Sequence, residues 1–198
     1  MAIIITPAST RALTTPDEVA RQLGIKADAD NAPRLIELIL AASAAIEGTL
    51  RRTLTLQQYE EHVYVAASRP AVLSHTPVRT ITIDGIAGLL GREVDVGTGL
   101  LSLPAGTHVV TYWAGHDLPG SDPRPDGAPP ADPMRFHLPV AITRAATLLA
   151  ASYWHSSARD PWVKSETVDG VGSQSFGNIG SAVEVDALLA PHRDVPVA

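Results

Sequence analysis

Residues 138–155 read LPVAITRAATLLAASYWH and form the most apolar helical pattern in the chain. Arg144 is the only charged side chain before the last residue of this segment. One helical face carries Ile142, Ala145, Ala146, Leu149 and Tyr153, and the other carries Leu148, Ala151 and Trp154. A helix that is apolar nearly all round is buried on most sides. The segment therefore predicts either the central helix of a bundle or a helix covered by another subunit.

Two earlier segments also predict helices. Thr15 can cap a helix, Pro16 fits its first position and Gly24 can end it, which predicts a short helix near 16–23. A longer helix is expected over about 30–52, with apolar residues at helical spacing: Leu35, Ile39, Ala42, Ile46 and Leu50. We expect Arg51 and Arg52 in the last turn of this helix, where cations suit the helix dipole.

Residues 54–113 change to a period of two, which is typical of strands. In 54–66, the side chains of Tyr59, Glu61, Val63 and Val65 share one face. Turn residues separate the extended segments, which are 54–66, 78–84, 92–96, 99–103 and 108–113. The pattern predicts a small antiparallel sheet inserted between the helices.

A long Gly/Pro-rich loop, residues 114–137, follows the predicted sheet and contains six prolines between Pro119 and Pro133. Proline lacks a backbone donor, so the loop is expected to form no strand ladder and to act as a mobile arm or as an extended strap on a neighbour. After the apolar helix, 164–176 predicts a β-hairpin, and the capping box at 181–184 opens a short helix that ends before Pro191.

The expected fold class is therefore α+β, mainly α. It comprises a small helical bundle, an inserted antiparallel sheet, and a C-terminal hairpin with a short helix. We expect a domain over 1–160, with the β insertion at about 54–113 and the Pro-rich loop at 114–137. A C-terminal hairpin and docking tail would span 161–198.

Composition limits the possible functions. The formal net charge is −6, which argues against gripping nucleic acid through clustered lysines and arginines. The chain has no cysteine, which excludes disulfides, thiolate metal sites and cysteine nucleophiles. No basic leader precedes the short apolar run at the start, and no apolar stretch approaches the roughly 18 residues of a membrane span. We expect a soluble, non-secreted protein that neither enters nor binds a membrane.

The sequence contains only weak signals for catalytic residues. His108, His116 and Asp117 lie around the end of one predicted strand, and His155 lies beside two serines, Ser156 and Ser157, ahead of Arg159 and Asp160. No zincin spacing, nucleophile elbow, or glycine loop followed by Lys-Ser or Lys-Thr is present. We therefore expect no catalytic residue, no metal and no cofactor, and the chain is interpreted as a non-enzyme.

The order of these elements resembles the head–tail connector family of siphophages, also called adaptor or head-completion proteins. The segments that carry the resemblance, in chain order, are LTTPDEV (13–19), AASAAIEGTLRR (41–52), YWAG (112–115), LPVA (138–141), YW (153–154), SETVDG (165–170) and LLAP (188–191). The resemblance covers most of the chain. The 114–137 loop departs from the family pattern, because it is longer and richer in proline than the usual short link.

The resemblance implies a structural virion protein at the head–tail interface, assembled in the host cytoplasm. Such a protein forms a ring of about twelve copies below the portal, extends the DNA channel and offers a platform for a stopper or tail protein. DNA would pass without specific binding. The C-terminal segment would dock on the portal. The expected portal or subunit contacts are Trp162, Val183, Val185, Leu188, Leu189, Pro191, His192 and Arg193.

A ring also requires different patches on the two sides of each subunit. The apolar helix at 138–155 and the small-residue face at 41–45 are candidates for one patch. Three alternatives stay open: another head-closure or tail-completion protein, a small hydrolase using His116 with Asp117 or using His155, and a host-directed binding protein that forms no ring.

Overall fold

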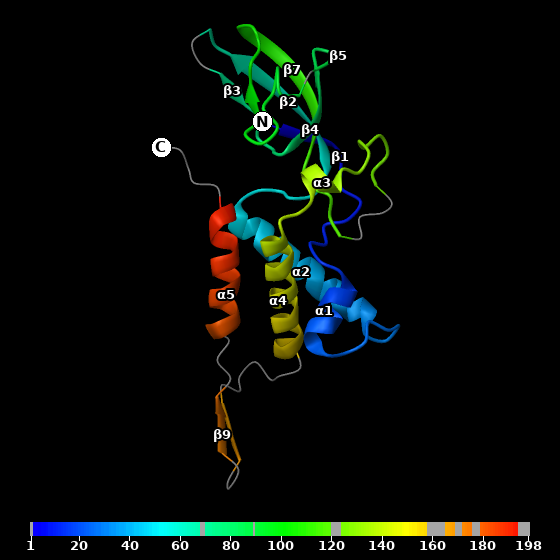
Figure 1. The fold of residues 1–198 in the computed structure, drawn as a ribbon, viewed down its shortest axis with the longest axis vertical. Helices are drawn as coiled ribbons and strands as arrows, with labels where there is room; N and C mark the ends of the chain where they lie inside the picture. The colour runs from blue at the N-terminus through cyan, green and yellow to red at the C-terminus, as the bar shows by residue number, and fades with distance from the viewer. Residues whose placement is uncertain are drawn as a thin grey trace. The chain divides into compact units, whose positions relative to one another are not determined.

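The structure is a computed structural model that describes residues 2–67, 70–88, 90–119, 124–157, 165–168, 172–175 and 179–193 (Figure 1). The chain divides into two compact units. The β unit comprises Met1–Arg11 and Arg52–Leu138, and the helical unit comprises Ala12–Arg51 and Pro139–Ala198. The domain boundary expected at 160 falls outside the described residues and stays a prediction. The mixed α+β fold class is confirmed.

The β unit is built on a five-stranded antiparallel sheet in the order β1-β2-β7-β4-β5. Its strands are β1 (Ala2–Thr6), β2 (Gln57–Val65), β4 (Val78–Ile83), β5 (Ile86–Ala87) and β7 (Gly106–Ala114). Two short strands, β3 (Ala71–Val72) and β6 (Leu100–Leu101), pair with each other. The long pair β2–β7 runs from Gln57 opposite Ala114 to Val65 opposite Gly106 and forms the centre of the sheet.

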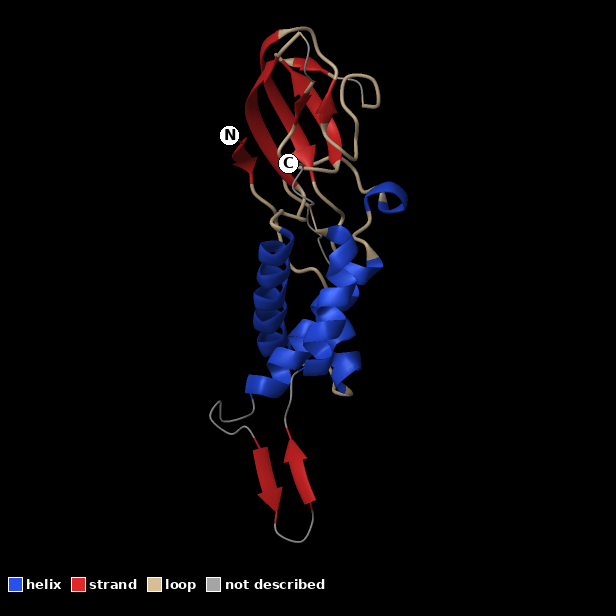
Figure 2. Ribbon diagram, turned by 90° about the vertical axis from the view of Figure 1, so that its left-hand side faces the viewer, coloured by secondary structure: helices blue, strands red, loops and turns tan. Residues whose placement is uncertain are grey.

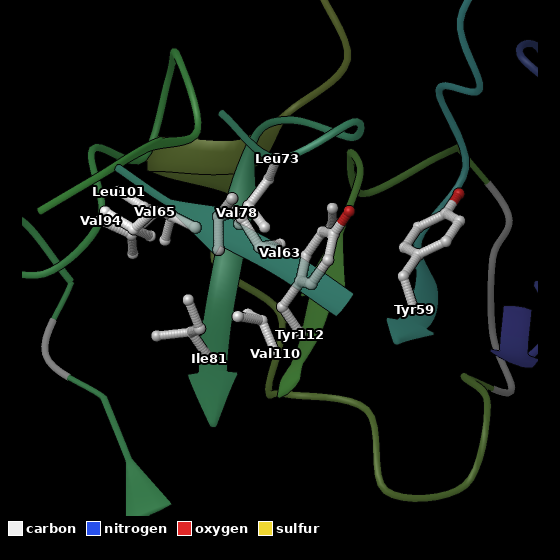
Figure 3. Packing of buried hydrophobic residues seen from close by; sticks show 11 residues of the cluster. Tyr59, Val63, Val65, Leu73, Val78, Ile81, Val94, Leu101, Val110 and Tyr112 are labelled. Atoms are coloured by element: carbon white, nitrogen blue, oxygen red, sulfur yellow. The ribbon is translucent and has the colours of Figure 1, made fainter. Parts of the chain in front are cut away.

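Burial along β2 alternates as the sequence predicts. Tyr59, Glu61, Val63 and Val65 are all buried, and the side chains between them are more exposed. The buried apolar residues join Val110 and Tyr112 of β7 and side chains of β4 and the adjoining turns in one core (Figure 3). The period of two therefore predicted the buried face of the sheet correctly.

Two parts of the sheet differ from expectation. β1 was not predicted, and it forms an edge of the sheet by pairing with β2. The strand expected over 92–96 is wrong, because only Val94 is paired there, through isolated bridges. Turns on both sides break the strand: Gly91 N–H donates to the Val94 carbonyl, and the Asp95 carboxylate accepts from the Thr98 N–H.

The helical unit contains α1 (Pro16–Leu23), α2 (Ala32–Leu50), α4 (Val140–Ser157) and α5 (Ile179–Leu189), followed by a 3-10 turn, Ala190–His192. For α1 the local signals are confirmed, since Thr15 accepts from the Glu18 N–H and Gly24 is left-handed with φ 70°. The expected last-turn role of Arg51 and Arg52 is wrong. Helix α2 ends at Leu50, and Arg51 takes a left-handed conformation that directs the chain out of the helix.

Helix α4 is the central helix of its unit. It packs against α1, α2 and α5, which Figure 1 labels, and Figure 2 shows the helices of this unit from a second side. Buried alanines at 145, 146, 150 and 151 allow these close contacts. Of the two interpretations of the apolar segment 138–155, the central bundle helix is the one observed within a single copy.

The remaining elements are short. The predicted C-terminal hairpin is present as β8 (Ser165–Val168) paired with β9 (Gly172–Ser175). In its described residues, the Pro-rich loop contains one helical turn, α3 (Pro133–Phe136), and two isolated bridges, His116 with Thr55 and Asp117 with His137. Among the described helices, none is long and apolar enough to cross a membrane.

Candidate functional site

The residues expected to contact a portal or neighbour lie on α5 and the turn after it, apart from Trp162, which is outside the described residues. Val185 and Leu189 are buried. Val183 is 63% exposed, and Pro191 and Arg193 are also exposed. Leu188 and His192 are half-buried. Arg193, just after the 3-10 turn, forms an ion pair with Asp186 of α5. The exposed members of the set are thus the ones a partner could reach.

His108 belongs to a surface ion pair. Its Nδ1 lies 2.7 Å from Oδ2 of Asp84, and its Nε2 lies 3.0 Å from the carbonyl oxygen of Pro104. The hydrogen bond to Asp84 raises the pKa of His108, and the same bond lowers the pKa of Asp84. Asp84 also accepts from the Val109 N–H, so the pair closes the turn between β4 and β5 against β7.

His116 is half-buried beyond the end of β7, with Nδ1 3.1 Å from the carbonyl oxygen of His137. Burial, with a smaller contribution from the Arg52 guanidinium, lowers the pKa of His116 to about 4. His116 and Asp117 are neighbours in the chain, but their side chains bond to different partners. The geometry therefore gives His116 no carboxylate partner and does not build the acid–base pair that a hydrolase would need.

Asp117 is the centre of a clamp on the Pro-rich loop. Its carboxylate accepts hydrogen bonds from Arg79 and Arg124 and from the Asp132 N–H. The two guanidinium groups in turn donate to the carbonyl oxygens of Pro130 and Pro129. Burial acts to raise the pKa of Asp117, but the hydrogen bonds from Arg79, Asp132 and Arg124 outweigh it, and the pKa is lowered. We call Arg79, Asp117 and Arg124 the loop clamp.

The loop clamp fastens the described part of the Pro-rich segment to its own β unit, and the expected strap on a neighbour stays a prediction. The Arg79 side chain is only 2% exposed and lies over the Phe136 ring, 4.6 Å from its centroid. A buried guanidinium needs a compensating charge. The described part of the loop, from Arg124 to His137, is thereby fastened to the β unit.

A second buried polar cluster lies inside the β unit. Glu61 is 3% exposed, and its carboxylate accepts from the Ser74 N–H at 3.3 Å. His75 stacks on Tyr59 with ring centroids 3.9 Å apart. Burial, then the nearby Glu61 charge, raises the pKa of Tyr112, and burial lowers the pKa of His75. The period of two in the sequence placed Glu61 on the same face as Tyr59 and Val63. It did not predict the contacts of Glu61 with Ser74 and Tyr112.

His155 is exposed at the end of α4. The hydroxyls of Ser156 and Ser157 donate to carbonyl oxygens one turn earlier, at Tyr153 and Trp154. Arg159 and Asp160 lie outside the described residues. The serines are thus engaged by their own helix. Among the described residues, no group of three or more His, Asp or Glu side chains could hold a metal ion.

Two surfaces of the helical unit include parts of the candidate patches at 41–45 and 138–155, but their full extent was not found from the sequence. The first is an open groove of ≈ 280 Å³ between α1 and α4, here called the α1–α4 groove. It is lined by Glu18, Arg21, Gln22, Val140, Thr143, Arg144 and Thr147. The Arg144 guanidinium donates to Gln22 Oε1 at 2.7 Å, and Glu18 accepts from the Thr14 hydroxyl at 2.7 Å.

The second surface is the exposed side of α2, here called the α2 outer face. Its residues are Ile36, Leu40, Ala41, Ala44, Ala45 and Gly48. Ile36 is 48% exposed and Leu40 is 43% exposed. The other side of the helix supplies Leu35, Ile39 and Ala42 to the core. Helix α2 is thus apolar on both sides, and the described residues of the chain cover only one of them.

The whole fold is shared with proteins of known structure. No protein-family model matches the chain, and no curated protein matches it. Chains with the same fold occur in the neck of an empty gene transfer agent particle computed with C6 symmetry, in the virion of a native gene transfer agent particle, and in the neck of a native particle computed with C12 symmetry.

The respective TM-scores are 0.57, 0.54 and 0.54, with sequence identities of 23%, 22% and 24%. Each match covers 100% of this chain and 97% of the other. The likeness therefore extends over both the helical unit and the inserted sheet, and it establishes a common fold for the full length.

Proposed function

We propose that this chain is a structural neck subunit of a phage-like particle. More specifically, it is a head–tail connector that binds below the portal, forms a ring around the DNA channel and carries the stopper or tail. The observation that carries this proposal is the full-length fold match to chains from gene transfer agent necks and virion. The ordered sequence resemblance to siphophage connectors, drawn from motifs alone, supports the same assignment independently.

The side-chain chemistry favours an assembly role over an enzymatic one. Two of the titratable groups that could suggest catalysis are engaged in fastening the fold: His108 on Asp84, and Asp117 on Arg79 and Arg124. The α2 outer face, in contrast, is apolar and uncovered within one copy. A surface of that kind is typical of protein–protein contact.

The net charge of −6 suits a channel subunit. Clustered cations would bind DNA phosphates and retard passage. In this proposal DNA passes without specific binding, the site of action is the virion neck, and assembly takes place in the host cytoplasm.

Portal docking is assigned to the exposed residues of α5 and the turn after it, Val183, Pro191 and Arg193. The test mixes the full chain with the portal protein of the same particle and measures mass by multi-angle light scattering, with electron microscopy of the complex. We expect a portal-bound ring. A protein that stays monomeric at high concentration and ignores its portal would contradict the proposal.

A matched pair of variants tests the docking residues. Val183→Asp places a charge on α5, and Val72→Asp makes the same change at a valine of the β unit that is 58% exposed. We expect Val183→Asp to lose portal binding and Val72→Asp to keep it. Equal binding by both variants would remove α5 from the portal contact but leave the neck assignment standing.

A further inference from the structure

The α2 outer face lacks the polar side that a solvent-facing helix normally has. Between residues 36 and 49, Glu37 is the only charged residue among the exposed positions of α2. Ile36, Leu40, Ala44 and Gly48 follow one another at a spacing of four, so they form a continuous stripe. Small residues in that stripe allow close approach of another helix. Glu37 makes no ion pair within the described residues.

The α1–α4 groove has the complementary character. Two of its lining residues, Arg21 and Arg144, are cations, and neither pairs with a carboxylate in the described part of the chain. Glu18 is its one anion, which leaves the lining with a net charge of +1 (two cations, one anion). Val140 adds an apolar contact at the groove, with 77% of its surface exposed.

The two surfaces lie on different sides of the helical unit. On α1, Val19, Ala20 and Leu23 pack in the same cluster as Leu35 and Ile39 of α2. The groove residues Glu18, Arg21 and Gln22 are on the opposite side of α1, because successive helical residues are about 100° apart. In Figure 1, α1 and α4 lie in front of α2. The α2 outer face is therefore turned away from the helices that form the groove.

We propose that the α2 outer face of one copy of this chain occupies the α1–α4 groove of the next copy. Ile36 and Leu40 pack against Val140, and Glu37 faces Arg21 and Arg144. This inference rests on the proposed neck function, since neighbouring copies in a ring of more than two subunits contact each other through two different surfaces. Both surfaces belong to the helical unit, so one unit supplies both sides of the contact.

Charge reversal tests the contact in the full chain. Glu37→Arg and Arg144→Glu each bring like charges together across every interface. We expect each to raise the protein concentration needed for half-maximal assembly by about tenfold or more. The double variant restores opposite charges, and we expect its assembly to return towards that of the unchanged protein. Asp126→Arg, at an exposed acidic residue of the β unit, is the control and should assemble normally.

Sedimentation velocity measures assembly of the chain alone, and electron microscopy measures it on the portal. If the unchanged chain and both single reversals form rings equally well on the portal, the interface is wrong and the neck assignment stands. If the single reversals fail and the double variant is not rescued, the pairing of Glu37 with Arg144 is wrong.

Crosslinking gives a readout that does not depend on ring stability. The chain has no cysteine, so Ala44→Cys and Thr143→Cys introduce the only thiols. We expect the double variant, treated with a short bis-maleimide, to give a ladder of covalent oligomers, and each single variant to stay monomeric. Dimers from Ala44→Cys alone would show that α2 meets α2 instead. A chain that ignores the portal but still gives the ladder would contradict the neck function and support the interface.

The same experiment identifies other occupants of the groove. Absence of a ladder from the double variant, both alone and on the portal, overturns the proposal. A crosslink from Thr143→Cys to the portal would assign the groove to a portal segment.

Discussion

Gly115 lies so close to the backbone of Thr55 that a Cβ at position 115 would be 2.3 Å from the Thr55 carbonyl oxygen. Its φ of 123° is also one that side-chain-bearing residues rarely adopt. Gly115 N–H donates to the Pro77 carbonyl, and the next residue, His116, donates to Leu54. The YWAG motif of the sequence thus ends in a glycine because two segments of backbone meet there.

Replacing Gly115 with alanine is expected to destabilise the β unit by about 2–4 kcal/mol, because the Thr55 backbone cannot move aside cheaply. Gly127→Ala is the control: its φ is 76°, but nothing lies within 4 Å of its Cβ position. It should cost only about 1 kcal/mol. Hydrogen exchange of β7 peptides under increasing urea measures the loss of unfolding free energy in each of the two variants. Equal losses of stability in the two variants would show that the positive φ, and not the close approach to Thr55, causes the destabilisation.

Asp117→Asn removes the charge that compensates the buried Arg79 guanidinium. We expect a loss of about 3 kcal/mol and faster hydrogen exchange across residues 124–137. Asp126→Asn, at an exposed position of the same loop, should change neither. An unchanged exchange rate in Asp117→Asn would show that the loop is held by other contacts.

The loop clamp also predicts that the folded protein loses stability at acidic pH. The pKa of Asp117 is lower in the folded chain than its ordinary value, so its stabilisation is complete above that ordinary value. Stability should be lost as the pH falls through the folded-state pKa. Urea unfolding from about pH 5 to about pH 2, the range in which aspartates titrate, measures this loss. This loss of stability on acidification should be smaller in Asp117→Asn.

His116 gives a second pH dependence in a higher range. Its pKa of about 4 is below the ordinary histidine value, so the unfolded chain binds more protons than the folded chain between the two values. Stability should therefore fall as the pH decreases from about 6.5 towards 4. His116→Gln should flatten this part of the profile, measured by thermal unfolding. A profile that keeps its slope in the variant would place the titration elsewhere.

His108 should titrate above the ordinary histidine pKa because it bonds to Asp84. A two-dimensional NMR titration of the imidazole resonances measures this directly. Asp84→Asn should return the midpoint of His108 towards its ordinary value, while Asp95→Asn, which removes only the carboxylate bonded to Thr98, should leave it unchanged. If the titration midpoint of His108 did not change in Asp84→Asn, the ion pair would not be the cause of its raised pKa.

The parts of the fold that were predicted from sequence depend on local signals. Thr15, Pro16 and Gly24 determine both ends of α1, and each acts within one turn of the helix. The alternation in β2 likewise reports which side chains are buried. In contrast, the Ile3-Ile4-Ile5 run has no alternation, and β1 exists only because β2, about 55 residues later in the chain, offers an open edge.

The candidate surfaces were harder to foresee, for the same reason. Helical spacing predicted the buried stripe of α2, but the exposure of Ile36 and Leu40 depends on which side α1 and α4 cover. The burial of Arg79 depends on Asp117, which is 38 residues away in the chain. The portal contacts on α5 and the ring contact at the α1–α4 groove stay predictions.

The chain passes between its two units at residues 11–12, 51–52 and 138–139, so the β unit is built from two separate pieces of sequence. A fragment that carried only residues 52–138 would lack β1 and expose the backbone of β2 along its outer edge. Such an edge invites pairing with other molecules. The sheet therefore cannot be transplanted into another protein as a single cassette. Exchange of the β unit between proteins of this fold, in the laboratory or by recombination, has to carry the N-terminal strand with the insertion.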